Sequence, residues 1–273
     1  MIGCGTSTFT DPRDFCSPGI GLDVAFALTA AESFRVHLVW ASLPSTHMLV
    51  IEERTPRIAF LSLPPGKACL SFPLRGDPAS FWNGVRLRRG ALALHASGDR
   101  FHHRTTGFAR WGMIVMAAGQ FANLGAALLG ADVTLPARSS ILCLPRAIAG
   151  DFLRLYAQAF RLVEDRPDLF AHREVARALE QDLVRALVCG LQVAEKPAGS
   201  ANPRQAEMMV RFEDVLVRAP RQPPSMAELC RDVGVSPRTL RRSSAAILGC
   251  SPTEYLRLKR GANPAETISA ENA

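Results

Sequence analysis

The chain has 273 residues, of which 48% are hydrophobic and 21% are charged, and its formal net charge is +7. This composition is that of a folded soluble protein, it excludes a disordered or collagen-like chain, and the length allows one or two domains. The positive charge suits an anionic partner. Most of this excess charge falls in residues 204–260, which contain eleven Arg or Lys and six Asp or Glu, for a net charge of +5.

The seven cysteines are scattered, odd in number and without any Cys-x-x-Cys or mixed Cys/His spacing. Such cysteines are typical of free thiols in a reducing compartment, so we expect neither a metal site nor another cofactor. The start, MIGCGTSTFTDPRDF, lacks a basic segment followed by an apolar core, so no secretory signal is expected. These features predict a cytoplasmic location.

Residues 1–22 are rich in Thr, Ser, Asp, Pro and Gly, and we expect them to be loosely ordered. From residue 23 to about residue 145, short apolar runs recur between Pro or Gly breaks; they include RVHLVW, HMLVIEE, RIAFLSL, ACLSFPL and ALALHA. Short strands with regular turn signals predict a small antiparallel barrel or sandwich.

Residues 111–131 carry no charged side chain and have about the length of a membrane span. Gln120, Asn123 and several glycines interrupt this segment, which favours a buried strand, a turn and then a core helix from about Gln120. We therefore predict no association with a membrane.

Helical periodicity begins near Ala147 and continues to about residue 195, which closes a first domain over residues 23–195. The inward faces of its two helices comprise Phe152, Leu155, Tyr156, Ala159, Phe160 and Val163, and then Val175, Leu179, Leu183, Leu187 and Leu191. The second helix has a heptad-like seam. This seam predicts either a homodimer or packing of the helix on its own barrel.

The run EKPAGSANPR contains two prolines, a Gly and a Ser without apolar periodicity, which indicates a linker at residues 196–204. A second domain is expected over residues 205–261. Its first helix, residues 206–219, would turn Met209, Phe212, Val215 and Leu216 inward.

Residues 225–252, SMAELCRDVGVSPRTLRRSSAAILGCSP, fit two short helices joined by a tight bend. Cys230 is small where the helices cross, Gly234 permits a left-handed turn, and Leu229 and Leu240 face inward. Ser236 can cap the second helix, and a proline suits its first turn. This order of signals predicts a helix-turn-helix. An ordinary surface hairpin is the alternative, but residues 236–252 contain no acidic side chain.

Two phrases of this segment, AELCRDVGVSPRTLRR and LGCSPTEYLRLKR, resemble the AraC/XylS family of transcription regulators. The resemblance covers about residues 204–260 and implies an all-α helix-turn-helix domain that binds double-stranded DNA. It also implies that residues 23–195 form a cupin-like sensor domain that binds a small-molecule effector or dimerises. The expected fold class is therefore α+β, and the expected function is sequence-specific regulation of transcription.

The chain departs from the family pattern at two places. Ser243 and Ser244 stand where the family typically has a Leu-Phe pair, and loss of a buried Phe removes several kcal/mol, so we expect a marginally stable domain. Gly261 and Pro264 should end the last helix, which leaves residues 262–273 as a disordered tail and a second helix-turn-helix unit missing. The alternative function is a ligand-binding or dimerisation module with a truncated, weakly or non-functional DNA-binding domain.

The second helix of the motif, residues 236–249, is the expected recognition helix in the major groove. Basic groups near its start would approach base edges, and those of the following helix would contact phosphates or face solvent. The predicted DNA-binding residues are Ser236, Arg238, Thr239, Arg241, Arg242, Arg257, Lys259 and Arg260. The predicted helix-turn-helix core is Leu229, Cys230, Gly234 and Leu240.

His102 and His103, with His95 upstream, are the nearest approach to a metal or catalytic cluster. Adjacent side chains on a strand point to opposite faces, so the pair cannot bind one ion, and we expect turn or surface histidines. We find no nucleophile elbow, phosphate-binding loop or catalytic carboxylate pair, and therefore expect no enzyme. Five aromatic side chains could line an effector pocket but more readily fill a core: Trp40, Phe60, Phe72, Trp82 and Trp111.

Overall fold

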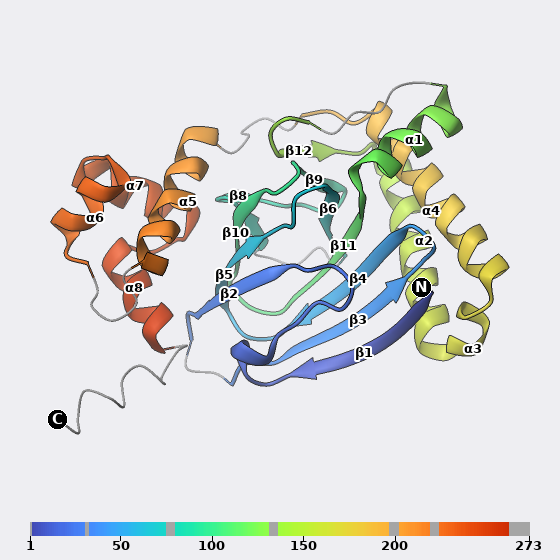
Figure 1. Cartoon of the computed structure of the whole chain (residues 1–273), viewed down its shortest axis with the longest axis horizontal. Coiled ribbons are helices and arrows are strands. Elements are labelled where there is room, and N and C mark those ends of the chain that lie inside the picture. Colours follow the sequence, from blue (N-terminus) through green and yellow to red (C-terminus); the bar gives the residue numbers. More distant parts are fainter. Residues whose placement is uncertain are drawn as a thin grey trace.

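In the computed structural model the chain forms β-strands first and helices second (Figure 1). The structure describes residues 2–30, 33–74, 80–130, 136–196, 202–218 and 224–261. The strands are β1 (Gly3–Phe9), β2 (Asp23–Leu28), β3 (Val36–Ser42), β4 (Thr46–Glu53), β5 (Arg57–Ser62), β6 (Lys67–Pro73), β7 (Ser80–Trp82), β8 (Val85–Arg86), β9 (Ala91–His95), β10 (Arg100–Thr105), β11 (Ala109–Ala117) and β12 (Ser140–Cys143). The helices are α1 (Ala118–Leu129), α2 (Arg146–Asp165), α3 (Pro167–Phe170), α4 (Arg173–Gln192), α5 (Pro203–Arg218), α6 (Met226–Val233), α7 (Pro237–Ile247) and α8 (Pro252–Gly261), with a 3-10 turn η1 (Pro12–Asp14).

The strands form two antiparallel sheets that face each other. The seven-stranded sheet has the order β1-β3-β4-β11-β6-β9-β12, and the five-stranded sheet has the order β2-β5-β10-β7-β8. Alternate residues of each strand point inward, so Met113 of β11 lies in the core between the sheets while Ile114 faces the helices. This architecture, followed by helices, confirms the predicted α+β fold class.

Helices cover the outer face of each sheet (Figure 1). Helices α2 and α4 pack on the seven-stranded sheet, where Tyr156 donates its hydroxyl to the backbone carbonyls of Leu49 at 2.6 Å and Met113 at 3.0 Å. Leu183 and Leu187 of α4 are buried in this layer, so the middle of its predicted seam packs on its own barrel. A homodimer stays a prediction.

The N-terminal residues correct one expectation. Residues 1–22 were expected to be loosely ordered, but β1 pairs with β3 from Gly3 opposite Ser42 to Phe9 opposite Val36. An edge strand is held by main-chain hydrogen bonds and needs no apolar alternation, which is why a composition rich in Thr and Ser concealed it. Ile20, which follows the strand, is buried between the sheets.

Within the uncharged segment of residues 111–131, residues 111–129 form the predicted buried strand and helix, but β11 passes directly into α1 without a turn. The helix is anchored by the buried Phe121, whereas Gly119, Gln120 and Asn123 are exposed, so it lies on the surface and is not a core helix. Among the described residues, no helix has the length and apolarity needed to cross a bilayer.

The aromatic residues considered for an effector pocket mostly fill cores. Trp82 and Trp111 lie between the two sheets, and Phe72 packs beneath α2. Phe60 packs on a histidine of β10 on the outer face of the five-stranded sheet, and Trp40 is partly buried beside β1.

Much of the predicted linker and all of the predicted tail lie outside the described residues. Residues 197–201 and 262–273 are not described, while Glu195 pairs with Cys143 through two backbone hydrogen bonds and α5 begins at Pro203. The domain boundary at residues 196–204 therefore stays a prediction.

The interior between the sheets contains a buried ion pair. Nε of Arg57 donates to Glu53 at 2.6 Å, a second Arg57 nitrogen donates to the other oxygen of Glu53, and Trp111 Nε1 donates to Glu53 at 2.8 Å. Arg57 also donates to Nδ1 of His103 at 2.9 Å. Burial, and then the positive charge of Arg57, hold the pKa of His103 well below its ordinary value, so this imidazole is neutral.

Replacement of Arg57 by Met should lower the free energy of unfolding by about 3–5 kcal/mol, because the Glu53 carboxylate would remain buried without its cation. Urea denaturation measures the loss. The matched control Arg54→Met removes the exposed pair of Arg54 with Glu52 and should lower the free energy of unfolding by less than about 1 kcal/mol. The double variant Arg57→Met/Glu53→Gln should recover part of the loss. Equal effects of Arg57→Met and Arg54→Met would contradict the prediction.

Candidate nucleic-acid interface

Helices α6 and α7 form the compact bend that the sequence predicts. Ser225 and Glu228 cap α6 reciprocally, since the Ser225 hydroxyl accepts the Glu228 N–H and the Glu228 carboxylate accepts the Ser225 N–H. Gly234 adopts the left-handed conformation, with φ of 76°, and ends α6. Ser236 then accepts the Thr239 N–H at 3.2 Å and caps α7.

The predicted core residues lie in one apolar cluster beneath this bend. Leu229 and Leu240 are fully buried and Cys230 nearly so, in contact with the cluster that also contains Phe212 of α5 and Tyr255 of α8. Gly234 lies at the turn with open space around its α-carbon, so its role is conformational.

The outer face of α7 carries the predicted arginines. Arg238, Arg241 and Arg242 are exposed, and none of them makes an ion pair with another described residue. The helix expected over residues 236–249 is shorter in the structure, because α7 ends at Ile247. Thr239 is half-buried, and its hydroxyl lies 2.9 Å from that of Ser236, so both hydroxyls are engaged in the cap.

The following helix divides its predicted basic residues between two faces. Arg257 and Arg260 are exposed on α8, as phosphate contacts would require. Lys259 was expected to contact phosphate or face solvent, which is wrong: its Nζ donates to the buried carboxylate of Glu213 at 2.6 Å. The residue lies on the side of α8 that faces α5, because Tyr255, one turn earlier, is fully buried.

Glu213 is the residue that sequence reasoning missed. It is fully buried on α5 and receives hydrogen bonds from Lys259, from the Tyr255 hydroxyl and from Nε2 of His102 at 2.9 Å. Burial alone would raise the pKa of this carboxyl, but the hydrogen bond from His102 and the charge of Lys259 outweigh burial and lower the pKa to about 2. Glu213 lies four residues after the inward-facing Met209, and this spacing places both residues on the same buried face of the helix, so the sequence did contain a signal for its burial.

His102 belongs to β10, so this cluster joins the five-stranded sheet to the C-terminal helices. The expectation that His102 and His103 are turn or surface residues is wrong, because both are buried in a central strand. They do point to opposite faces, His102 toward Glu213 and His103 toward Arg57. Among the described residues, no group of three or more potential metal ligands occurs.

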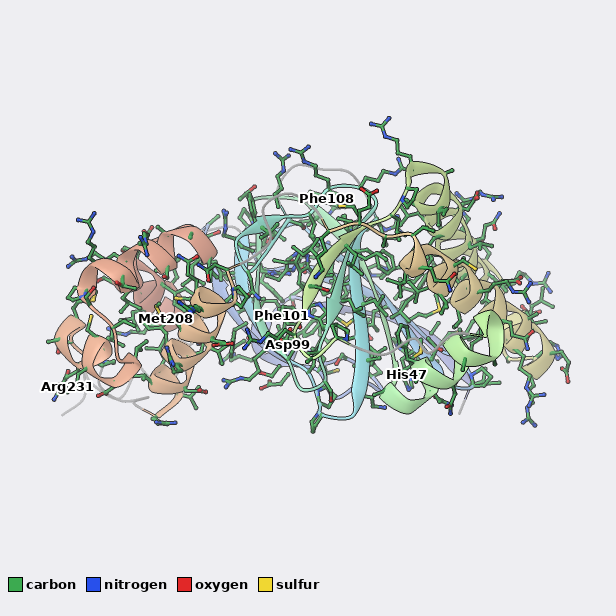
Figure 2. The ribbon with its side chains drawn as sticks, turned by 90° about the horizontal axis from the view of Figure 1, so that it is seen from above. His47, Asp99, Phe101, Phe108, Met208 and Arg231 are labelled. Atoms are coloured by element: carbon green, nitrogen blue, oxygen red, sulfur yellow. The ribbon has the colours of Figure 1, made fainter. Side chains whose placement is uncertain are left out.

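Close backbone contacts place α7 against the same sheet. A Cβ atom on Gly84, in the turn between β7 and β8, would lie 2.4 Å from the carbonyl oxygen of Ala246. A Cβ atom on Gly249 would lie 2.9 Å from the guanidinium carbon of Arg104, which stacks on Phe81 at 4.0 Å. The C-terminal end of α7 is therefore docked on the sheet. Figure 2 shows Arg231 of the helical domain at the end farthest from the barrel.

No family model matches the sequence, and a search of curated proteins finds no match. Among solved structures, the chain is similar to the AraC-like transcriptional activator CuxR, with 16% identity, 88% of this chain and 86% of that chain covered, and a TM-score of 0.45. For fatty-acid-bound ToxT from Vibrio cholerae the identity is 9%, the coverages are 84% and 83%, and the TM-score is 0.34. For a cupin 2 conserved barrel domain protein from Rhodopseudomonas palustris the identity is 14%, the match covers 50% of this chain and 85% of that chain, and the TM-score is 0.20. These TM-scores lie below 0.5, so the similarities assign no function to the chain.

The two serines of α7 differ in their hydrogen bonding. Ser243 and Ser244 are both fully buried, but Ser244 donates to the Cys250 carbonyl at 2.7 Å, whereas the Ser243 hydroxyl finds no partner among the described residues. Ile247 and Leu248 fill the cluster beside them, and Ile58 of β5 joins it from the sheet. Marginal stability of this domain stays a prediction.

Ser243→Ala should leave the free energy of unfolding unchanged or raise it by about 1 kcal/mol, because it removes an unpaired buried hydroxyl. Ser244→Ala should lower that free energy by about 1 kcal/mol, because it leaves the Cys250 carbonyl unpaired. Urea denaturation of the two variants side by side measures the difference. A larger loss for Ser243→Ala than for Ser244→Ala would show that the hydroxyl of Ser243 is satisfied.

The ionised Glu213 carboxylate should make stability depend on acidity. Its pKa in the folded protein is about 2, below its ordinary value of 4.5, so its contribution is complete above pH 4.5 and is lost as the pH falls toward 2. The loss should amount to about 3 kcal/mol. Urea denaturation at several pH values in this window measures it.

Glu213→Gln should flatten the pH dependence within that window, although it also lowers stability at neutral pH. Glu207→Gln, on the exposed face of the same helix, is the matched control and should keep the slope of the wild-type protein. A slope unchanged by Glu213→Gln would contradict the assignment of the acid sensitivity to this carboxylate.

Proposed function

We propose that the protein is a sequence-specific transcription regulator that places α7 in the major groove of double-stranded DNA. The observation that carries this proposal is the division of α7 into a buried face and a free basic face. The buried face comprises Leu240, Ser243, Ser244 and Ile247, and the basic face comprises Arg238, Arg241 and Arg242.

The chemistry of the basic face fits the groove. A helix is about 10–12 Å wide and the major groove about 12 Å, so a helix supported from behind can enter it. The planar fork of an arginine can donate two hydrogen bonds to O6 and N7 of one guanine. Because the hydroxyls of Ser236 and Thr239 bond to each other, these two residues orient the start of α7, and the methyl group of Thr239 is left for apolar contact.

Phosphate contacts would come from α8. Arg257 and Arg260 are exposed there, and each phosphate that they neutralise would steepen the dependence of affinity on salt. Lys259 does not belong to this set, since its ammonium group neutralises Glu213. The proposed division of labour follows the predicted boundary at residues 196–204, with regulation in the N-terminal part and DNA binding in the C-terminal part.

One α7 with a few phosphate contacts should bind DNA weakly, and two copies held together would gain affinity through their effective concentration. We therefore propose that specific binding requires a homodimer. The alternative is a ligand-binding or dimerisation module whose helix-turn-helix no longer binds DNA.

Combined replacement of Arg238, Arg241 and Arg242 by Ala should abolish specific binding to DNA. Each arginine that reads a guanine contributes about 1–3 kcal/mol of discrimination, and each one that contacts phosphate contributes about one unit of salt slope. The full chain is first used to select bound sequences from random duplexes. Electrophoretic shifts at two salt concentrations then compare the variants.

The matched control replaces three exposed arginines of α2 and α4, which lie on the opposite side of the barrel: Arg161, Arg177 and Arg185. It lowers the net charge by the same amount, so it should reduce the affinity for DNA only slightly. Equal losses of DNA affinity in the two triple variants would show that the interaction depends on net charge alone, and would contradict the proposal. No selected sequence and no shift at low salt would favour the alternative module.

A further inference from the structure

The exposed face of α7 continues onto the barrel. Arg238, Arg242 and Ala246 follow one another at intervals of four residues and are all exposed, so they form one ridge along the helix. The carbonyl oxygen of Ala246, at the end of this ridge, packs against Gly84 in the turn between β7 and β8. This turn therefore lies directly beside the exposed face of α7, at its C-terminal end.

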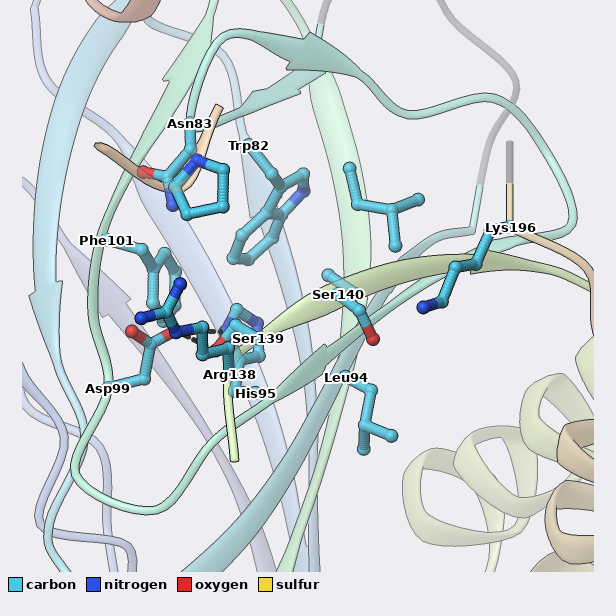
Figure 3. Close-up of a pocket in the computed structure, with 13 residues that line it drawn as sticks. Trp82, Asn83, Leu94, His95, Asp99, Phe101, Arg138, Ser139, Ser140 and Lys196 are labelled. Atoms are coloured by element: carbon cyan, nitrogen blue, oxygen red, sulfur yellow. Dashed lines mark hydrogen bonds and ion pairs between the residues drawn. The ribbon is translucent and has the colours of Figure 1, made fainter. Parts of the chain in front are cut away.

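The turn is fastened to the sheet. The backbone N–H of Asn83 donates to the carbonyl of His102 at 2.9 Å, and the side-chain oxygen of Asn83 accepts the N–H of His102 at 2.9 Å. Figure 3 shows Trp82 beside Phe101, and both rings belong to the core between the sheets. A side chain carried by the strands at this turn is therefore held at a fixed place beside α7.

The pairing of strands puts two arginines on the outer face of the five-stranded sheet. Arg104 of β10 pairs with Phe81 of β7, which in turn pairs with Arg86 of β8. Arg104 also pairs with Ile58, which lies in the cluster that contains Leu240 of α7. Since paired residues share one face of a sheet, the row faces the C-terminal helices and ends at Arg86 on the edge strand.

The residues after β8 add a third arginine to this face. Leu87 is buried between the sheets, so its two neighbours, Arg86 and Arg88, point away from the interior. Both are exposed, and neither forms an ion pair within the part of the chain that the structure describes. Residues 80–98 contain no Asp or Glu at all. We call Arg86, Arg88 and Arg104 the basic rim.

Arg104 is the fixed member of the basic rim. Its guanidinium carbon lies 4.0 Å from the centre of the Phe81 ring, and the same group packs against Gly249, just beyond the end of α7. Arg104 is half-buried and has no acidic partner among the described residues. A partly desolvated cation without a counter-ion costs free energy, which an anion bound beside it would offset.

We propose that the basic rim binds phosphate groups of the same DNA that α7 reads, so that the barrel itself takes part in DNA binding. This inference rests on the proposed placement of α7 in the major groove. The ridge from Arg238 to Ala246 is about 12 Å long, and Arg86 lies about 7 Å along the strand from Gly84. The major groove is about 12 Å wide, so cations beyond the end of the ridge meet the phosphate backbone that borders it.

Phosphate contacts of this kind add affinity without sequence information. They also require that the helical domain keep its orientation on the sheet, because the ridge belongs to one half of the molecule and the basic rim to the other. DNA that contacts both therefore stabilises the docked arrangement in which His102 pairs with Glu213.

The double variant Arg86→Ala/Arg88→Ala should bind the duplex selected by the full chain about thirtyfold more weakly at about 0.15 M salt, because two phosphate contacts are lost. The slope of log affinity against log salt concentration should fall by about two units. The ratio of affinities for the selected duplex and a scrambled one should stay unchanged, since phosphates carry no sequence information. Electrophoretic shifts over a range of salt concentrations measure all three quantities.

The matched control Arg161→Ala/Arg177→Ala removes the same charge from α2 and α4 on the far side of the barrel, and should keep the slope of the wild-type protein. All four arginines are exposed, so neither variant should disturb folding, and circular dichroism verifies this.

Hydroxyl-radical footprinting gives a second readout. The wild-type protein should protect a stretch of backbone beside the bases that α7 reads, and Arg86→Ala/Arg88→Ala should lose protection of that stretch alone. A salt slope and a flanking protection equal to those of the control variant would overturn the proposal.

The two proposals fail in different ways. If the triple variant of Arg238, Arg241 and Arg242 loses specific binding while Arg86→Ala/Arg88→Ala matches its control, α7 reads DNA and the basic rim does not contact it. If only Arg86→Ala/Arg88→Ala loses affinity, the basic rim binds phosphates and the placement of α7 is wrong. Failure of the full chain to bind any duplex would overturn both.

Discussion

The relation between the two halves of the molecule depends on one buried carboxylate. Glu213 lies at the centre of the interface with no access to water, and a charge in such a place is tolerated only when it is paired and fully hydrogen-bonded. Tyr255 and Lys259 satisfy it from α8, within the helical domain, and His102 satisfies it from β10. The third partner, His102, belongs to the sheet. The buried Glu213 carboxylate keeps this hydrogen bond only when the C-terminal helices lie in one orientation on the sheet, so the need to pair the carboxylate also fixes that orientation.

Apolar packing and close backbone contacts reinforce the same interface. Ala27 of β2 and Ile58 of β5 lie in the cluster that contains Leu240 of α7. Gly84 lets the turn between β7 and β8 approach the backbone of α7 at Ala246, to a distance that any larger residue would prevent, and the Arg104 side chain packs against Gly249 just beyond the end of α7. The basic face of α7 is thereby supported by the sheet from behind, as well as by α5 and α8.

The sequence contains enough local information for most of the elements and for the turn of the C-terminal motif. Gly234, Ser236 and the apolar spacing of α6 and α7 act over a few residues, so their consequences can be worked out from neighbouring positions alone. The interface could not be predicted in this way. The partners of Glu213 come from residues 102, 255 and 259, and nothing in the local pattern of Lys259 distinguishes it from the exposed Arg257. The edge strand β1 was missed for a similar reason, because its pairing with β3 is a main-chain property of a distant segment.

The five-stranded sheet is covered on both faces, by the other sheet on one side and by the C-terminal helices on the other. Proteolytic separation of the two halves would therefore strip Ile58, Phe60 and the imidazole of His102 of their cover, and would leave Glu213 one hydrogen bond short. Each fragment would expose an apolar surface to solvent and would be prone to aggregation. We therefore expect each half to depend on the other for the cover of its apolar surface.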